Sequence, residues 1–529
     1  MKLTAIMAAA LTAGIAFGGM TQFAAAQDAP TRLVGGFDVG PGGFPNNVNP
    51  LLATTGYMAL TLAYEPLVIY DEKIEKVVGR LADSFEISPD GLTYTFKLAA
   101  DAKWHDGEPF TSKDVAFTLN LAKDTASGSV YVARLSTIAE IATPDDQTVV
   151  LTLSQPNSSL LDTLTKVMML PEHRLAGIAP DTLARNDYWI TDPVGTGAFR
   201  FKQYSPNQYI EYEAFADYRR GKPKIDQLVN RYFKTPAAAV AALKAGEIAV
   251  SYVEADDIKN FQTDSAFRVI EGNSQVVNYL GFNFAAKIWD DVRVRKAVMY
   301  AIDRETIIEQ LYNGKATAAN CGYSAARLVP DGLETYAYDP DKARALLEEA
   351  GWGEINGDKP ISVLTYYNND QANNVMAAMQ AMLAQVGINI APRTVDMAGY
   401  NATIYAKPID PSQFQIVYAG LTNGPNPGNL NIGLNAAQIP PNGSNYTRVD
   451  IPAVSEAFDT AMKQTTPEGM DKAYSDVCKA MNENLPWATL WETKRYGVES
   501  AKLKNLNWQP APGGGPYEMH PELWELETN

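Results

Sequence analysis

The sequence predicts an α/β protein with at least two lobes, on three observations. The chain has 529 residues, which is more than one hydrophobic core usually serves. Stretches typical of strands alternate with stretches typical of helices in its second half, as in an α/β lobe. Hydrophobic residues make up 46% of the chain and charged residues 20%, as in soluble globular proteins.

The charge balance argues against several classes of partner. Lysine and arginine number 44, and aspartate and glutamate number 61, so the formal net charge is −17 at pH 7. An acidic protein repels phosphate backbones and anionic membrane surfaces, so we expect no nucleic-acid partner. After the first 26 residues no stretch reaches membrane-span length without charges, so we also expect no membrane insertion of the mature chain. The sequence shows no Walker A, G-x-G-x-x-G, G-x-S-x-G or H-E-x-x-H pattern.

The first 26 residues are typical of a cleavable export signal. Met1-Lys2 supplies a positive start, an apolar run follows to Met20, and Ala24-Ala25-Ala26 places small residues before a cleavage site. We therefore expect cleavage before Gln27 and a mature chain in the periplasm. A membrane anchor is the alternative, but the apolar run is short and contains glycines.

The first half of the mature chain is expected to hold a hairpin and a turn-rich segment. Residues 35–50, rich in Gly, Pro and Asn, predict an ordered loop. Pro89-Asp90-Gly91 is a turn tripeptide, and the alternating residues 92–98 predict a half-buried strand. His105 and Asp106 are neighbours that would point to opposite faces, so we expect a turn and not an acid–base pair.

Residues 278–314 predict a strand followed by two capped helices. Strand-forming aromatics fill 279–284. Asp291 and Asp303 each precede an apolar periodic stretch, and their carboxylates can accept hydrogen bonds from the first helical turn. Gly314 can end the second helix, because glycine adopts the left-handed conformation at little cost.

The remaining second half alternates between strands and helices, with expected strands over 361–367, 388–394, 414–419 and 485–492 and expected helices over 341–350, 374–385, 454–463 and 469–483. The third of these strands opens into the loop 420–428. Ligands bind at the carboxyl ends of strands in open α/β sheets, so this loop is a candidate binding site.

Three phrases of this sequence are similar to those of a known family. Residues 291–307 read D-x-R-V-R-x-A-x-x-x-A-I-D-R-x-x-I, residues 88–98 read S-P-D-G-x-T-Y-T-F-x-L, and residues 103–115 read K-W-H-D-G-x-P-F-T-x-x-D-V. They resemble signatures of the bacterial extracellular solute-binding proteins of family 5, which are the peptide, nickel and oligosaccharide receptors of ABC importers. The resemblance extends over residues 32–526.

This resemblance implies an α/β, bilobal periplasmic-binding-protein fold of type II, in the large cluster with an extra subdomain in the first lobe. The chain would cross the hinge twice, near 272–277 and 493–498. The signal peptide would be 1–26, the first lobe 27–276 plus 497–529 with an inserted subdomain at roughly 70–190, and the second lobe 277–496.

The implied function is that of a receptor that captures a solute between its lobes and delivers it to the permease subunits of an ABC importer in the inner membrane. It would be a monomer, without catalysis and without a cofactor. An exported sensory ligand-binding protein and a secreted hydrolase are the alternatives from other classes. We expect no metal site, because the chain's three histidines, His105, His173 and His520, all fall in the predicted first lobe.

One departure from the family bears on the solute. Peptide-binding relatives usually carry G-W-x-x-D in the loop 420–428, where the Asp pairs with the peptide's ammonium, whereas this chain has Leu421 and Gly424. An ammonium buried without a counterion would be costly. We therefore expect an oligosaccharide, a sugar conjugate or a peptide-like solute, favour the sugars because their hydroxyls would suit asparagine side chains, and keep a dipeptide or oligopeptide as the alternative.

The predicted solute contacts are mostly aromatic, amide and charged side chains near the expected hinge and strand ends. They are Asn46, Asn47, Tyr64, Glu65, Tyr131, Tyr279, Tyr418, Leu421, Thr422, Asn423, Asn426, Asn445, Trp491 and Arg495. Trp491 and Arg495 are four residues apart, so in a strand they would share a face. An indole offers a flat apolar surface, and a guanidinium can fork onto a carboxylate or phosphate. The alternative places Trp491 in the core and pairs Arg495 with surface acids.

The chain has two cysteines, Cys321 and Cys478. An oxidising compartment would allow them to form one disulfide. Two unpaired thiols are the alternative, because the spacing of cysteines along a sequence does not give the distance between them in space.

Overall fold

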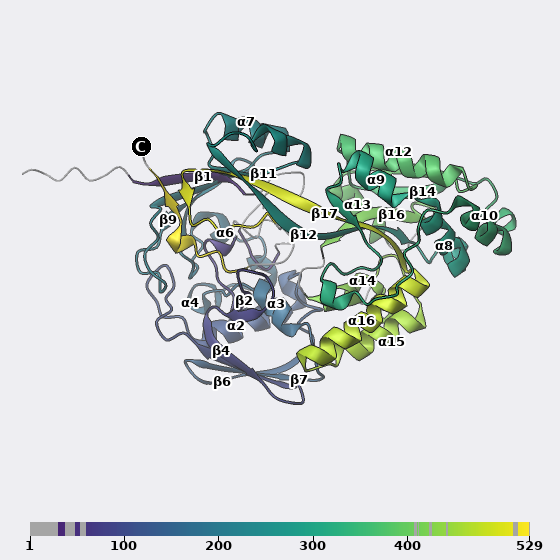
Figure 1. Cartoon of the computed structure of the whole chain (residues 1–529). Coiled ribbons are helices and arrows are strands. Elements are labelled where there is room, and N and C mark those ends of the chain that lie inside the picture. The colour runs from purple at the N-terminus through teal and green to yellow at the C-terminus, as the bar shows by residue number, and fades with distance from the viewer. Residues whose placement is uncertain are drawn as a thin grey trace, which may run out of the picture. The chain divides into compact units, whose positions relative to one another are not determined.

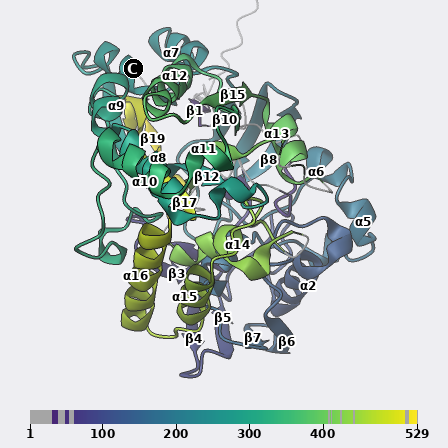
Figure 2. The ribbon, with the colours of Figure 1, turned by 90° about the vertical axis from the view of Figure 1, so that its right-hand side faces the viewer.

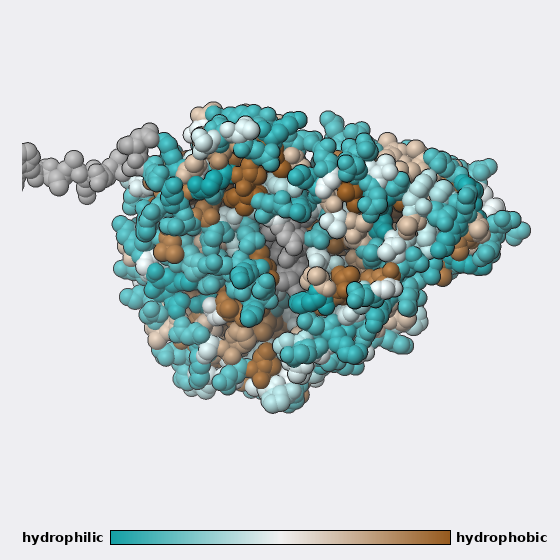
Figure 3. All heavy atoms as spheres, viewed as in Figure 1, coloured by the Kyte–Doolittle hydropathy of each residue, from teal (hydrophilic) through white to brown (hydrophobic). Residues whose placement is uncertain are grey.

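The structure is a computed structural model that describes residues 30–37, 48–52, 60–406, 410, 412–422, 426–440, 443–510 and 517–527. Residues Thr31–Asn529 form one compact unit. None of the helices in the described ranges is both long enough and apolar enough to cross a bilayer. On the face shown in Figure 3 most residues are hydrophilic, and the hydrophobic residues lie in scattered groups.

A mixed β-sheet organises this unit (Figure 1). Among the described residues it has eleven strands, of which β13 (Ala316–Ala318) pairs only with β17. The order of the others is β15 (Ile390–Thr394), β14 (Ile361–Thr365), β16 (Ile416–Thr422), β12 (Phe267–Phe282), β17 (Trp487–Ser500), β11 (Val250–Val253), β1 (Arg32–Gly36), β10 (Gln227–Arg231), β9 (Tyr209–Ala214) and β8 (Phe199–Ser205).

Two long strands connect the cores of two lobes. β12 and β17 pair antiparallel over residues 267–281 and 487–500. At one end β17 contributes Val498 to a first-lobe core beside α7 (Pro236–Lys244). At the other end Leu280 and Leu490 belong to a second-lobe core. The same two strands therefore carry the chain from one lobe to the other in both directions.

The first lobe contains residues from both ends of the described chain. Leu33 near the start and Leu503 and Trp524 near the end share its largest core. A separate sheet in this lobe has the order β4 (Ala82–Ile87), β5 (Thr93–Leu98), β7 (Thr148–Leu153), β6 (Ile138–Asp145). The predicted hairpin is confirmed, since β4 and β5 pair across a turn in which Gly91 has φ +69°.

Shorter elements complete the first lobe. They are β2 (Val68–Tyr70), β3 (Val77–Gly79), α2 (Ser112–Lys123), η1 (Thr125–Ser127), α3 (Leu160–Lys166), α4 (Glu172–Leu175), α5 (Pro180–Leu183), α6 (Tyr188–Thr191), η2 (Ala255–Asn260), β18 (Leu503–Lys504), η7 (Pro521–Leu523) and β19 (Glu525–Leu526).

Two capped helices open the second lobe as the sequence predicts. The Asp291 side chain accepts a hydrogen bond from the Arg293 N–H at the start of α8 (Val292–Ala301), and the Asp303 side chain accepts one from the Thr306 N–H at the start of α9 (Arg304–Leu311). These bonds satisfy N–H groups that the helix itself leaves free.

Arg295, which lies off the predicted apolar stripe of α8, is nevertheless 97% buried, since its exposure is 3%. Its guanidinium donates to the carbonyls of Asp290 and Leu485 at 3.1 and 3.0 Å. Backbone carbonyls therefore satisfy the buried cation, which ties α8 to the start of β17. Tertiary contacts of this kind leave no trace in the helical periodicity.

The other second-lobe elements follow the predicted alternation with shifted ends. They are η3 (Lys287–Trp289), η4 (Ala326–Leu328), α10 (Pro340–Glu349), α11 (Trp352–Ile355), α12 (Asp370–Ala384), α13 (Met397–Ile404), η5 (Pro427–Leu430), α14 (Asn431–Leu434), η6 (Ala436–Gln438), α15 (Pro452–Met462) and α16 (Pro467–Asn484). The two long helices α15 and α16 pack side by side (Figure 2).

Candidate functional site between the two lobes

The carboxyl ends of two parallel strands lie at one edge of the second lobe. β14 and β16 run in parallel, with Thr365 opposite Tyr418. Tyr366 and Tyr367 follow β14 directly, and their ring centroids are 4.7 Å apart. In open α/β sheets this edge is where ligands bind, so the two tyrosines stand at the expected place.

Hydrogen bonds hold these tyrosines against the neighbouring strands. Tyr367 Oη donates to Asn278 Oδ1 at 3.1 Å, and Tyr366 Oη donates to the Gly420 carbonyl at 3.4 Å. A Cβ atom at Gly420 would lie 2.3 Å from Tyr367 Oη. Glycine at this position of β16 therefore allows the close approach of the tyrosine.

The hinge strand β17 contributes an arginine to this place, and the first lobe contributes two aromatic rings. Arg495 on β17 is exposed, and its Cζ atom lies 5.6 Å from the ring centroid of Tyr252 on β11. Tyr252 in turn meets Trp508 edge to face, with centroids 4.8 Å apart. A guanidinium over an aromatic face is a favourable cation–π arrangement.

The charge of Arg495 acts on groups of both lobes. Burial raises the pKa of Glu254, which follows β11, and Arg495 acts in the opposite direction on this carboxyl. Burial also raises the pKa of Tyr366 and Tyr367, and Arg495 again opposes the shift. Arg495 therefore lies near enough to side chains of both lobes for its charge to lower their pKa values.

The lobes also touch each other directly. The hydroxyls of Ser158 and Tyr474 are 2.8 Å apart, and Ser158 N donates to the Met462 carbonyl at 3.2 Å. Elsewhere Asn313 Nδ2, after α9, donates to Asp256 Oδ1 in η2 at 2.8 Å. The structure thus holds the two lobes in contact.

Three predicted contacts of the first lobe lie in its interior. Tyr64 is buried in the main core. Glu65 Oε1 accepts hydrogen bonds from Arg80 Nε at 2.6 Å and from Tyr218 Oη at 2.9 Å. Tyr131 Oη donates to the Lys166 carbonyl at 2.9 Å. The structure therefore gives Glu65 and Tyr131 partners within their own lobe.

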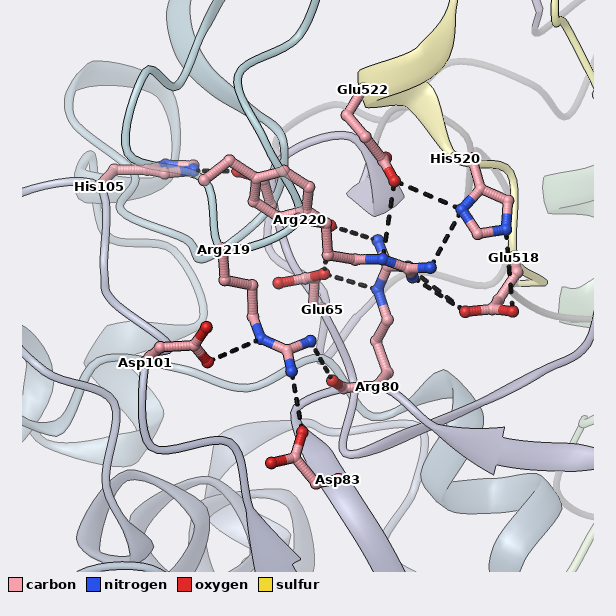
Figure 4. A network of polar contacts seen from close by, with 12 residues as sticks. Glu65, Arg80, Asp83, Asp101, His105, Arg219, Arg220, Glu518, His520 and Glu522 are labelled. Carbon is pink, nitrogen blue, oxygen red and sulfur yellow. Dashed lines mark hydrogen bonds and ion pairs between the residues drawn. The ribbon is translucent and has the colours of Figure 1, made fainter.

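The ion pair of Glu65 belongs to a larger polar network (Figure 4). Arg220 donates to Glu518 at 2.9 Å, and its other terminal nitrogen is 3.0 Å from His520 Nδ1. His520 Nε2 is 3.0 Å from Glu72. These contacts fasten the C-terminal residues to the first lobe and give the network a structural role.

The predicted aromatic residues of the second lobe are buried. Tyr279 stacks on Trp487 with centroids 4.1 Å apart, and its hydroxyl lies 2.5 Å from that of Tyr446. Tyr418 is 1% exposed and belongs to the core. Trp491 is 0% exposed and packs against Tyr312. Trp491 is therefore a core residue here, although Arg495 on the same strand is exposed.

The predicted polar contacts of the second lobe have local partners. Asn445 is 0% exposed, and its amide donates to the Asn435 and Val449 carbonyls. Asn426 is also buried; its Oδ1 accepts from the Gly428 N–H at 2.9 Å, whereas its Nδ2 has no hydrogen-bond partner among the described residues. Leu421 is half-buried beside the core.

The remaining predictions fall elsewhere. Asn46, Asn47 and Asn423 lie outside the described residues, and Thr422 is described only as backbone of β16.

A disulfide joins Cys321 to Cys478 in α16, with Cα atoms 5.5 Å apart. In the described ranges no group of three or more His, Cys, Asp or Glu side chains could hold a metal ion.

Most of the side chains near Arg495 are absent from the predicted solute contacts. Tyr366 and Tyr367 could have been found, because they form an aromatic pair at the carboxyl end of the predicted strand 361–367. Tyr252, Glu254 and Trp508 could not, because they meet Arg495 only through strand pairing and the return of the C-terminal segment.

An open groove of about 830 Å³ lies elsewhere on the first lobe, between the end of β10 and α7. Arg231 lines it and is held by Glu247 at 2.7 Å. None of the predicted solute contacts lines this groove, so it is separate from the inter-lobe site.

Comparisons with known proteins agree with this architecture. The family model "Bacterial extracellular solute-binding proteins, family 5 Middle" matches residues 76–434. A putative ABC transporter peptide-binding protein of Brucella melitensis is 57% identical over 99% of this chain and 100% of its own. The dipeptide-binding protein of Escherichia coli is 32% identical over 77% of this chain and 79% of its own.

Solved structures share the fold. The oligopeptide-binding protein AppA from Bacillus subtilis, in complex with a nonapeptide, has a TM-score of 0.81 at 25% identity, covering 94% of this chain and 100% of that one. NikZ from Campylobacter jejuni, in complex with Ni(L-His), has a TM-score of 0.78 at 23% identity, covering 93% and 99%. The chain therefore belongs to the bacterial extracellular solute-binding proteins of family 5.

Proposed function

We propose that this chain is the periplasmic receptor of an ABC importer, that it closes its two lobes on a peptide or peptide-like solute, and that it delivers this solute to the permease subunits. The convergence of Arg495, Tyr366 and Tyr367 at the β12–β17 junction carries the proposal, because it brings polar and aromatic groups of both lobes to one place. The peptide, dipeptide and oligopeptide binding in the relatives' names supports it.

The preference for a peptide over a sugar follows from the asparagines. The sugar interpretation relied on free, accessible amide groups, but Asn445 uses its amide on the Asn435 and Val449 carbonyls, and both Asn445 and Asn426 are buried. A tyrosine-lined site beside an arginine suits the apolar and anionic parts of a peptide-like solute.

The same proposal covers the export of the chain, its monomeric state and the boundaries of its two lobes. Export removes residues 1–26, and the mature receptor acts as a monomer that catalyses no reaction. The first lobe comprises 27–276 plus 497–529 and the second 277–496; membership of the hydrophobic cores supports this division. Edman sequencing of periplasmic protein should begin at Gln27. Recovery of Met1, or protein found only in membranes, would contradict the export part.

Binding and transport measurements test the central claim. Native mass spectrometry should identify a co-purified solute, and calorimetry with defined pools of dipeptides to hexapeptides should find micromolar or tighter ligands. Deleting the gene should abolish uptake of those ligands. Tyr367→Phe removes the hydroxyl at the site and should weaken binding, whereas Tyr338→Phe, on an exposed residue at 41%, should not. Hydrolysis of the ligand, or no binding by any pool, would overturn the proposal.

Recognition should not depend on a peptide ammonium. Gly424 stands where peptide-binding relatives carry the aspartate that pairs with this group. N-acetylation of a bound peptide should therefore change its dissociation constant by less than about threefold, since no carboxylate is lost as a partner. A loss of tenfold or more on acetylation would show that another acidic residue has taken over that role.

A further inference from the structure

Three neighbouring strands present one face beside Arg495. Cross-strand pairing places Tyr252 opposite Gly497 and Gly272 opposite Arg495. The same register, continued by one residue beyond β11, brings Glu254 opposite Arg495. Directly opposed residues of an antiparallel pair point to the same side and interact. Glu254, Arg495 and Tyr252 are therefore neighbours on one face.

Two glycines on this face leave room for the C-terminal segment. A Cβ atom at Gly497 would lie 2.6 Å from the Trp508 ring, and one at Gly272 would lie 2.7 Å from Pro510. Trp508 therefore rests on the sheet beside Tyr252, and the two rings form an aromatic wall. Arg495 lies next to this wall, with its Cζ atom 5.6 Å from the Tyr252 ring centroid.

The guanidinium of Arg495 has spare binding capacity. In the ranges that the structure describes, its side chain has a ring contact with Tyr252 and no hydrogen bond or ion pair. By contrast, Arg268, which also lies near the β12–β17 ladder, forms an ion pair with Glu499 at 2.7 Å. A guanidinium carries five N–H donors in a planar fork, so Arg495 can donate two parallel hydrogen bonds to an anion such as a carboxylate.

We propose that Arg495 binds a carboxylate of the captured solute, that Tyr252 and Trp508 pack against the carbon skeleton next to it, and that Glu254 restricts the site to a single negative charge. The inference rests on the proposed function, because it names the chemical group of the solute that the site between the lobes recognises.

The opposed pair explains the restriction to one charge. A carboxylate carries one charge and matches the guanidinium fork in two parallel hydrogen bonds. A phosphate ester carries up to two charges, and Glu254 stands directly across the ladder from Arg495. Like charges at that separation repel each other. The acidic chain, with a net charge of −17, adds to this preference.

Matched peptides test the carboxylate. A peptide that binds the wild-type receptor in calorimetry is compared with its C-terminal amide. We expect amidation to weaken binding by about 10- to 100-fold, which is the worth of a charge-assisted hydrogen bond. Arg495→Gln should weaken binding of the free acid by the same factor and leave the amide unchanged. Arg344→Gln, on an exposed helix arginine paired with Asp341, is the control and should change neither.

The acidic neighbour is tested separately. Glu254→Gln should strengthen binding of the free-acid peptide severalfold and should allow a phosphoserine-terminated amide to bind, since the repelling charge is gone. Unchanged affinity of both ligands for Glu254→Gln would overturn its role as a restriction.

The outcomes separate this inference from the proposed function. If no peptide binds the wild type, the proposed function fails. If a peptide binds equally well as acid and amide, the proposed function stands and the carboxylate site is refuted. Should Arg495→Gln fail to fold, as judged by circular dichroism, the acid–amide comparison on the wild type still decides.

Discussion

At the residue scale, burial fixes the protonation state of His105. Its Nε2 atom donates to the Gly197 carbonyl at 2.9 Å, and its Nδ1 atom accepts from the Gly195 N–H at 3.2 Å. Burial lowers the pKa of His105 to about 4. Asp106 instead contacts His173 at 2.9 Å, so the two neighbours do not form an acid–base pair.

Stability should therefore fall as the pH falls from about 6.5 toward 4. The unfolded chain binds a proton at His105 near its ordinary pKa of about 6.5, whereas the folded chain does not until about pH 4. The contribution lost over this window is about 3 kcal/mol. Urea unfolding at a series of pH values should show a shallower dependence for His105→Gln than for the wild type, and equal slopes would contradict the prediction.

Alanine substitutions at Trp491 and Arg495 should differ in their effects on the free energy of unfolding. Trp491 is 0% exposed, so Trp491→Ala should lower the free energy of unfolding by about 3–5 kcal/mol through a cavity. Arg495 is exposed, so Arg495→Ala should change it by less than about 0.5 kcal/mol. Urea denaturation measures both. If Trp491→Ala leaves the free energy of unfolding unchanged but abolishes solute binding, Trp491 is a solute contact and not a core residue.

At the element scale, the disulfide connects the segment after β13 to α16. Cys321 and Cys478 are separated by 157 positions, so the bond closes a long loop in the unfolded chain. Closing such a loop stabilises the folded state by about 2–5 kcal/mol. The Cys321→Ser, Cys478→Ser double variant should unfold at correspondingly lower urea concentration. If the wild-type protein takes up two equivalents of a thiol-reactive reagent under denaturing, non-reducing conditions, both cysteines are free thiols and the disulfide does not form.

At the scale of the whole molecule, we expect the contacts between the two lobes to favour a closed arrangement. Tyr474→Phe removes the hydroxyl that lies 2.8 Å from the Ser158 hydroxyl across the lobes. One such hydrogen bond is worth about 1 kcal/mol, so the closed population and the apparent solute affinity should fall about fivefold. Calorimetry measures the affinity, and small-angle scattering should show a larger radius of gyration. Tyr338→Phe is the matched control.

The sequence determined the elements whose causes are local. The caps at Asp291 and Asp303, the β4–β5 hairpin and the alternation of the second lobe follow from side chains within a few residues of one another. The family phrases also predicted the bilobal fold, which the comparisons confirm. The candidate ligand loop after β16 was predicted because it follows the carboxyl end of a predicted strand.

The tertiary structure decided what depends on distant pairing. β12 begins at Phe267, well before the predicted strand, because its polar and glycine-containing first half is held by β17. The pairing of β11 with β17 brings Tyr252 and Glu254 to Arg495, and the return of the chain places Trp508 over Gly497. Trp491 is buried while Arg495 is exposed, although both lie on β17, because each lobe surrounds its own part of the strand. Local periodicity carries no information about which distant segment covers a side chain.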